Sequence, residues 1–252
     1  MAWRLLLEGK KDPYLNMGTD EAILDGVSMG TSPRTLRLYM WRPSAVSIGR
    51  FQALEDSVDR EACDLAGVKV VRRLTGGGAV FHDEVGEVTY SLTMKEEDLP
   101  SRDYVMSFEY MARGVVEALR LLGYRAEFVP LNDVAIGGRK VSGSAQVRRG
   151  GAVLQHGTLL LSMDKGLAFR VLKVPAQKVA ERGLDRPEDR VVTLRALGYQ
   201  GGAEDVMKAL VQGFSSSLGR KFTEGDLTPL ERRAAEDMAE KRYRSRAWLE
   251  ER

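Results

Sequence analysis

The triple-glycine segment at residues 76–78 has the strongest capacity for chemistry in this sequence. It separates two strand-like runs, residues 68–73 and 79–81, and no side chain shields its backbone N–H groups. Such a loop can form a nest for an anionic group. Lys140, in a second glycine-flanked segment, adds a positive charge of the kind that holds phosphate or acyl-phosphate groups. The pattern therefore predicts an enzyme that acts on a phosphate-bearing compound.

The composition is that of a globular protein. The 252 residues are 43% apolar and 29% charged, enough to bury a sizeable core in one domain spanning residues 1–252. The net charge of +2 comes from 38 basic and 36 acidic residues that are well mixed, so we expect neither a nucleic acid nor a membrane as partner. No stretch approaches the roughly 20 apolar residues of a membrane span. We expect a cytoplasmic protein.

The single cysteine, Cys63, excludes an intramolecular disulfide. It lies beside acidic residues in a predicted helix, and acidic neighbours raise the pKa of a thiol, so we expect it to be buried or inert. The chain contains only two asparagines, Asn16 and Asn132, but many arginines and glutamates. This bias is associated with growth at high temperature and predicts a thermophilic source.

Hydrophobic patterns alternate between short strands and amphipathic helices without a regular strand–helix–strand repeat. Alternating apolar residues at 87–94 predict a half-buried strand, and apolar residues at spacings of three and four predict a helix over 101–122. Further strands are predicted at 36–41, 45–49, 133–136, 140–147 and 152–162, and further helices at 56–66, 204–218 and 228–243. Residues 174–190 are predicted to form a mobile loop. The pattern indicates an α+β fold with a largely antiparallel sheet flanked by helices.

Six ordered segments resemble one known family. They are residues 48–52, 72–83, 132–133, 139–145, 156–161 and 190–194. With these motifs the chain resembles the catalytic domain of lipoate-protein ligases, within the biotin/lipoate protein ligase superfamily, from about residue 5 to residue 248. It resembles the archaeal type that lacks a C-terminal accessory domain. A lone triple glycine is weak evidence, but six segments in the expected order are specific.

The resemblance implies a two-step reaction. ATP activates the lipoate carboxylate to lipoyl-adenylate with release of pyrophosphate, and the acyl group then passes to a lysine amine on a lipoyl-carrier domain. Backbone N–H groups and a cation can stabilise charge on the phosphoryl oxygens in the first step and on the acyl oxyanion in the second. Lys140, placed between carbonyl and phosphate, is expected as the central catalytic residue. ATP, Mg²⁺ and lipoate are the implied cofactors and substrate.

The resemblance also assigns further residues to the site. Those expected to bind ATP or lipoyl-adenylate are Arg73, Gly76, Gly77, Gly78, Ala79, Val80, Phe81, Asn132, Asp133, Lys140, His156 and Thr158. Asp133 is the expected Mg²⁺ ligand, because Mg²⁺ takes one or two protein carboxylates beside substrate phosphate. His82, Arg72 and Ser144 are further candidates. Residues 174–190 are expected to order over the adenylate and exclude water.

Several of these residues have a structural alternative. His156 and His82 can be hydrogen-bonded structural side chains, and their spacing does not suit a zinc site. Arg72 points to the face opposite Arg73 if the strand continues, which favours a structural ion pair. On spacing alone, Lys140 fits an exposed hairpin lysine. The apolar tunnel for the lipoyl chain is expected around Val80, Phe81 and Val141.

Two features depart from the family pattern. Where the family has Gly-Asn after the His-Asp pair, this chain has Gly86-Glu87, preceded by two residues, Glu84-Val85, that resemble an insertion. The family pattern therefore does not predict the contacts made at these positions. The sequence ends at Arg252, whereas larger family members continue with an accessory domain. We therefore expect a separate small accessory protein to complete the ligase.

Other functions stay open beside the ligase. Relatives of similar length transfer an octanoyl group from an acyl carrier protein to the same carrier lysine without ATP, through a cysteine shortly before the lysine motif. Residues 128–133 contain no cysteine, and Cys63 lies far away in the sequence. A catalytically silent lipoyl-binding or carrier-binding protein would need neither Lys140 nor the glycine nest. The expected carriers are components of 2-oxoacid dehydrogenases or a glycine-cleavage carrier protein.

Overall fold

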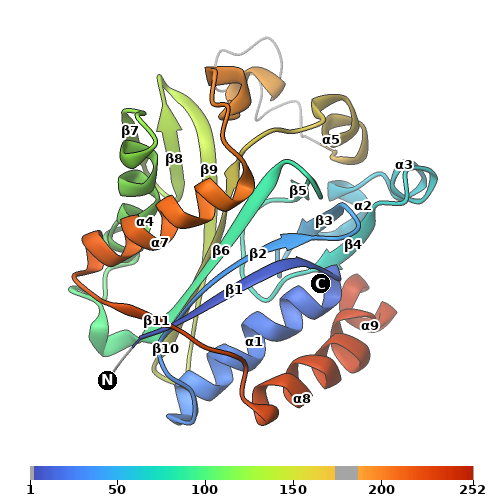
Figure 1. Cartoon of the computed structure of the whole chain (residues 1–252). Coiled ribbons are helices and arrows are strands. Elements are labelled where there is room, and N and C mark those ends of the chain that lie inside the picture. The colour runs from blue at the N-terminus through green and yellow to red at the C-terminus, as the bar shows by residue number, and fades with distance from the viewer. Residues whose placement is uncertain (1–2, 174–186, 252) are drawn as a thin grey trace.

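A computed structural model describes residues 3–173 and 187–251 of the chain (Figure 1). Its main sheet has the strand order β11-β1-β2-β6-β10-β9-β8-β7. The bounds are β1 (Trp3–Lys11), β2 (Thr35–Trp41), β6 (Glu87–Lys95), β7 (Ala126–Val129), β8 (Asp133–Ile136), β9 (Arg139–Arg149), β10 (Ala152–Leu160) and β11 (Phe222–Glu224). β1 pairs parallel with β2 and β11, and the remaining neighbours pair antiparallel. The expected α+β fold with a largely antiparallel sheet is confirmed.

A second, smaller sheet lies beside the main one in the order β4-β3-β5. Its strands are β3 (Ala45–Ile48), β4 (Lys69–Arg72) and β5 (Val80–His82), and α2 (Leu54–Ser57), α3 (Arg60–Leu65) and α5 (Lys165–Val171) accompany it (Figure 1). The prediction of one continuous helix at 56–66 is wrong, because the helix is interrupted at Val58 and Asp59. Val58 forms a β-bridge with Leu172, and the Asp59 side chain accepts from Ala62 N to start α3.

Helices cover both faces of the main sheet. α4 (Tyr104–Leu121) and α7 (Ala203–Leu218) lie on one face, and α1 (Pro13–Met29) and α8 (Pro229–Met238) lie on the other (Figure 1). The first pair packs into the largest apolar core, while α1 packs on β10 from the opposite side. β6 is therefore buried from Glu87 to Met94, and the prediction of a half-buried strand there is wrong.

Several helix boundaries follow from capping. The Asp103 side chain accepts from Met106 N at the start of α4. Thr228 and Glu231 form a reciprocal capping box at the start of α8. The helix predicted over 228–243 continues beyond α8 as a π-helical turn, Ala239–Tyr243.

The loop predicted at 174–190 falls mainly outside the described residues. Its last part, Pro187–Arg190, forms the 3₁₀ helix η2. In the described part of the chain, no helix combines the length and apolar character needed to cross a bilayer. Two further short helices are η3 (Arg195–Leu197) and α9 (Arg246–Glu250).

The close contact between α4 and α7 depends on a glycine. A Cβ at Gly213 would lie 2.6 Å from Ala118 N and would overlap the carbonyl oxygen of Gly114. We predict that Gly213→Ala lowers the free energy of unfolding, measured in urea, by about 1 kcal/mol or more. Overpacking costs about 1–3 kcal/mol, which exceeds the gain of roughly 0.5–1 kcal/mol from removing a helical glycine.

Gly166 offers a matched control for this substitution. It is exposed in α5, and the nearest atom to an added Cβ is Asp164 Oδ1 at 3.4 Å. Gly166→Ala should therefore leave the stability unchanged or raise it slightly. Equal effects of the two substitutions would contradict the role given to Gly213.

Candidate functional site

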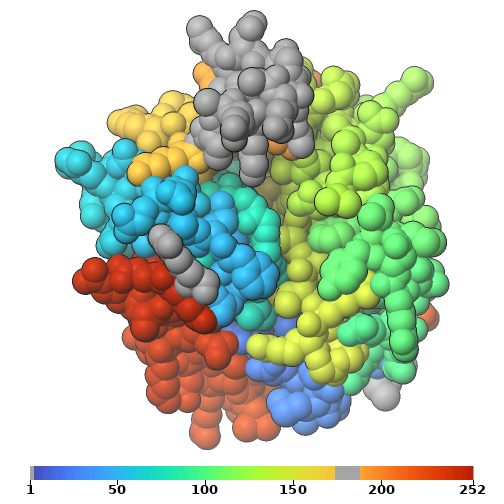
Figure 2. All heavy atoms as spheres, turned by 180° about the vertical axis from the view of Figure 1, so that it is seen from behind, coloured from blue at the N-terminus to red at the C-terminus, as the bar shows by residue number. Residues whose placement is uncertain are grey.

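A cavity of about 500 Å³ lies between the small sheet and the β8–β9 part of the main sheet. In the space-filling view, the segment around residue 50 and the strands β8 and β9 lie on opposite sides of a furrow (Figure 2). The apolar wall includes Met17, Val80, Phe81, Leu160, Met163, Ala168, Phe169 and Leu172. The cavity therefore offers a largely apolar chamber with charged groups at its wall.

Most of the predicted site residues come together here. Those that line the cavity are Arg73, Gly77, Gly78, Ala79, Val80, Phe81, His82, Asn132, Asp133, Lys140, Ser144, His156 and Thr158. Gly76 and Arg72 are not among the lining residues. The prediction that Val141 lines an acyl tunnel is wrong, because its side chain is fully buried in the main core beside α4.

One buried guanidinium, that of Arg73, holds the triple-glycine loop. Its Nη2 donates to the carbonyl oxygens of Gly76 at 2.7 Å and Gly78 at 2.8 Å. Its Nη1 donates to Ser47 O at 2.9 Å, and its Nε donates to Thr75 Oγ1 at 3.1 Å. None of these acceptors is a carboxylate, and burial lowers the pKa of Arg73 to about 10. Arg73 thus fixes the loop and places an uncompensated positive charge at the cavity wall.

The loop needs glycine at two points. Gly77 has φ of 93°, a left-handed conformation that favours glycine, and a Cβ there would lie 2.9 Å from Arg73 Nη2. A Cβ at Gly49, on the neighbouring strand end, would overlap the carbonyl oxygen of Gly77. Gly77 and Gly49 therefore permit close backbone approach. The carbonyl oxygens of Gly76 and Gly78 point to Arg73, so the loop presents acceptors as well as N–H groups.

Arg72 has a structural place, although not the expected ion pair. Its guanidinium donates to backbone carbonyl oxygens of Gly49 and Gln52 at 3.1 and 2.7 Å, and of Trp248 and Leu249 at 3.0 and 2.7 Å. The side chain therefore fastens α9 to the small sheet.

Lys140 forms a charge cluster with Asp133 and Arg190. The Lys140 Nζ lies 2.6 Å from Asp133 Oδ1, and Arg190 Nη2 lies 2.9 Å from Asp133 Oδ2. Gly143, opposite Asp133 in the β8–β9 register, makes room for the lysine, because a Cβ there would overlap Lys140 Nζ. Two cations share one carboxylate, so the cluster carries a net positive charge.

The neighbouring residues tie this cluster to the sheet. Asn132 Nδ2 donates to Ser144 O, and Ser144 Oγ donates to Asn132 O at 3.1 Å. Both oxygens of Asp133 already pair with cations, and the described residues contain no group of three or more His, Cys, Asp or Glu side chains that could hold a metal. A magnesium ion at Asp133 stays a prediction.

His156 belongs to a buried relay. Its Nε2 lies 2.7 Å from Thr75 Oγ1, and its Nδ1 lies 3.1 Å from Asp20 Oδ2. Asp20 Oδ1 also accepts from Arg37 Nη1 at 2.8 Å, and this guanidinium holds the carboxyl pKa below its usual range against the opposing effect of burial. Burial lowers the pKa of His156 itself. These contacts fit the structural alternative for His156, which connects the Thr75 end of the loop to α1.

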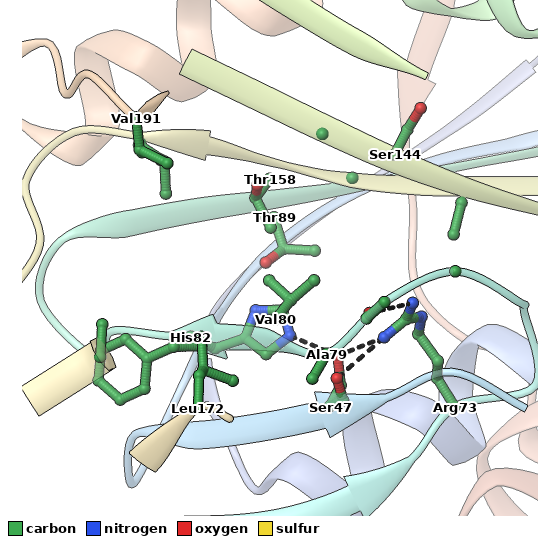
Figure 3. A pocket seen from close by; sticks show the side chains of 18 of the residues that line it. Ser47, Arg73, Ala79, Val80, His82, Thr89, Ser144, Thr158, Leu172 and Val191 are labelled. Atoms are coloured by element: carbon green, nitrogen blue, oxygen red, sulfur yellow. Dashed lines mark hydrogen bonds between the residues drawn. The ribbon is translucent and has the colours of Figure 1, made fainter. Parts of the chain in front are cut away.

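His82 belongs to a second relay. Its Nε2 lies 2.8 Å from Ser47 Oγ (Figure 3). Its Nδ1 lies 2.8 Å from Glu87 Oε1. The imidazole stacks on the Trp41 ring with 3.9 Å between centroids. Glu87, at the position where the sequence departs from the family pattern, is thus the buried partner of His82. Its Oε1 also accepts from Thr89 Oγ1 at 2.6 Å.

Ser47 and Arg190 are the main site residues that sequence reasoning missed. Ser47 lies inside the predicted strand 45–49, and its register opposite Val80 places it at the cavity. An isolated serine in a strand gave no signal, because only the pairing of β3 with β5 brings it to His82. Arg190 belongs to a family-like segment, but its partner Asp133 lies far away in the sequence.

The chain also matches a known family in sequence. The match is to the lipoyl protein ligase A/B catalytic domain and extends over residues 12–215. The chain belongs to this family.

Members of known name and structure are similar over the whole chain. The octanoyltransferase LipM of Kyrpidia tusciae is 38% identical, with 98% of this chain and 97% of that protein covered. The bi-partite lipoate protein ligase of Thermoplasma acidophilum, described with its E2 lipoyl domain, has a TM-score of 0.88 at 32% identity and covers 99% of this chain and 97% of its own. A lipoate-protein ligase A bound with ATP has a TM-score of 0.85 at 31% identity, with 99% of both chains covered.

These findings correct the predicted activity. Curated relatives that are 31–38% identical over nearly the whole chain are named octanoyltransferases. The prediction of an ATP-dependent lipoate-protein ligase is therefore wrong, and the alternative of acyl transfer is better supported. The lipoylation family and the fold are confirmed.

The buried His156 gives the folded chain a specific pH response. Because its folded-state pKa lies below the usual value of about 6.5, the unfolded chain takes up this proton first as the pH falls. We predict that the free energy of unfolding decreases between pH 7 and pH 5.5, with a slope below the single-proton limit of about 1.4 kcal/mol per pH unit. Denaturation in urea at several pH values measures this slope.

A variant separates His156 from other groups. In His156→Gln the slope over this range should become flatter than in the unaltered chain, although the variant is less stable at pH 7. Parallel profiles for the two chains would show that His156 does not carry the response.

Proposed function

We propose that this chain transfers an octanoyl group from an acyl thioester to a lysine of a lipoyl-carrier domain, without ATP. In the net reaction a C–N bond forms between the lysine Nζ and the acyl carbonyl carbon. The C–S bond of the thioester breaks, and the thiol leaves with the proton that the amine loses. The similarity to octanoyltransferases over 98% of the chain is the observation that carries this proposal.

The cavity is consistent with an acyl substrate. Apolar side chains such as Phe81 and Leu160 can surround the alkyl chain, and about 500 Å³ falls in the range of small-molecule pockets. Arg73 and Lys140 both line the cavity as cations. A positive charge near the carbonyl oxygen stabilises the oxyanion that forms when the carbonyl is attacked.

Lys140 is the residue for which we propose the larger role. It reaches the cavity from β9, and Asp133 holds its ammonium group in place. Arg190 supplies the second cation on the same carboxylate, so Lys140 keeps charge to offer to a substrate oxygen. The remaining predicted site residues would shape the chamber around the acyl group.

The proposed macromolecular partner is a lipoyl-carrier domain, from a 2-oxoacid dehydrogenase component or a glycine-cleavage carrier protein. The Thermoplasma ligase that this chain resembles is described together with an E2 lipoyl domain, which supports this choice. A cytoplasmic location, a thermophilic source and a separate accessory protein stay predictions.

A direct assay tests the activity. The purified chain is incubated with an apo lipoyl domain and either an octanoyl thioester of acyl carrier protein or free octanoate or lipoate with Mg-ATP. We expect an amide on the carrier lysine from the thioester alone, and none on a carrier whose lysine is replaced by arginine. Acylation only with ATP and pyrophosphate release would overturn the proposal. Carrier binding without any transfer would favour the catalytically silent protein.

Replacing Lys140 tests its role in the same assay. We predict that Lys140→Ala lowers kcat/KM for transfer by about 10²–10³-fold, the effect of losing one donor to an oxyanion. Lys241→Ala is the control, because Lys241 is 75% exposed and pairs only with Asp237 among the described residues. A similar kcat/KM for all three chains would remove Lys140 from the reaction.

The proposed transfer makes no use of the single cysteine. Cys63 is fully buried in the apolar cluster of Val46 and Ile48, and burial with nearby Asp64 and Asp59 raises its thiol pKa to about 11. We predict that Cys63→Ala retains transfer within about twofold, because a buried neutral thiol is a poor nucleophile. Loss of transfer at unchanged thermal stability would show that the thiol takes part.

A further inference from the structure

The hydroxyl of Ser47 has the surroundings of an activated nucleophile. Ser47 Oγ lies 2.8 Å from His82 Nε2, and His82 Nδ1 lies 2.8 Å from the carboxylate of Glu87. Ser47 and His82 both line the cavity (Figure 3). Glu87 is completely buried and is not among the lining residues. Serine, histidine and an acidic residue in this order form the arrangement in which a base removes the hydroxyl proton.

The hydrogen bonds determine which proton can move. An ionised carboxylate can only accept a hydrogen bond, so a neutral imidazole paired with an ionised Glu87 carries its proton on Nδ1. The lone pair of Nε2 then points at the Ser47 hydroxyl. Arg73 Nη1 lies 3.2 Å from Ser47 Oγ as a further donor. The base and a buried cation therefore meet at the same oxygen. Negative charge that develops there or on an adjacent acyl oxygen would be stabilised by Arg73.

The second relay shows that this arrangement is not by itself sufficient. Thr75, His156 and Asp20 have the same order of groups, but Thr75 is completely buried and does not line the cavity. A substrate in the cavity has no access to its hydroxyl. Among the described residues two hydroxyl groups contact a histidine, and of these only Ser47 belongs to a residue that lines the cavity. In the described part of the chain no cysteine lines that space.

We propose that Ser47 is the catalytic nucleophile and carries the octanoyl group as an ester between the two half-reactions. The proposal rests on the proposed function. Ser47 Oγ forms a bond to the acyl carbon and the C–S bond breaks, while His82 takes the hydroxyl proton and gives it to the departing thiolate. The carrier lysine amine then attacks the ester, the C–O bond breaks, and His82 returns the amine proton to Ser47 Oγ. Serine is thereby regenerated, and no further reactant is consumed.

Single-turnover mass spectrometry tests the intermediate. The full chain is mixed with octanoyl-acyl carrier protein in the absence of a lipoyl domain, quenched in acid and digested. We expect one octanoyl group on the peptide that contains Ser47, and its disappearance when apo lipoyl domain is added before the quench. Cys63→Ala should behave like the unaltered chain. Ser47→Ala should acquire no octanoyl group and should lower kcat by about 10³-fold or more.

Two further variants keep the test decisive if Ser47→Ala folds poorly. Ser47→Cys should form a thioester at residue 47 that neutral hydroxylamine cleaves, whereas the serine ester resists it. Glu87→Gln should keep the hydrogen bond to His82 but slow the loading of Ser47, because the charge that supports the imidazolium is lost.

The outcomes separate the two proposals. Transfer to the carrier with no adduct at residue 47 in either the unaltered chain or Ser47→Cys would overturn the ester intermediate and leave the proposed function intact, with the amine attacking the thioester directly. No transfer from the thioester in the unaltered chain would overturn the proposed function, and the intermediate with it.

Discussion

The buried guanidinium of Arg73 is the interaction on which the rest of the site depends. It hydrogen-bonds the triple-glycine loop, strand β3 and Thr75 at once, so the loop cannot move without losing several contacts to a buried charge. A buried donor left without a partner costs about 1–3 kcal/mol, and more when it is charged. Because all its partners are neutral, Arg73 fixes the wall of the cavity and leaves its charge available to a substrate.

Two histidine relays connect this wall to the scaffold. Thr75 and His156 lead to Asp20 on α1, where Arg37 from β2 balances the carboxylate. Ser47 and His82 lead to Glu87 at the start of β6. The small sheet is thus attached to the main sheet through polar groups. The two histidines differ in whether the hydroxyl group that they contact is accessible from the cavity. One holds a hydroxyl that is sealed from the cavity, and the other presents a hydroxyl to it.

The sequence predicted the parts of the fold that have a clear period or turn signal. Apart from β7, which was not predicted, the strands between Thr35 and Leu160 and the helices α4, α7 and α8 follow from such patterns. α1 was not predicted, because polar residues such as Asn16 and Asp20 are buried with its apolar ones and no simple stripe results. The prediction that β6 is half-buried was wrong. Whether helices cover both faces of a strand depends on the topology of the whole sheet, and the pattern within one strand does not show it.

The site shows the same division between local and long-range information. Lys140 and the triple glycine stand out by residue type and spacing, and most of the residues that the resemblance assigned to the site line one cavity. The pairing of Ser47 with His82, and of Asp133 with Arg190, joins segments about 35 and 57 residues apart in sequence. Such contacts have no local pattern. The prediction of an ATP-dependent ligase was wrong, because the chain is similar both to named octanoyltransferases and to solved ligases, so the family motifs do not separate the two activities.

The charges at the cavity have a consequence for the carrier lysine that the proposed transfer requires. Arg73, Lys140 and Arg190 supply three cations near the chamber, and the nearby carboxylate of Asp133 is already shared by two of them. A like charge disfavours the protonated form of an amine, so this environment opposes entry of an ammonium group and lowers the pKa of a lysine that approaches. Only the neutral amine can attack an acyl carbon. In the proposed transfer, the same cations that would stabilise an acyl oxyanion would thus favour the reactive form of the acceptor. Both effects follow from Arg73, which has no carboxylate partner, and from Lys140 and Arg190, which share one carboxylate.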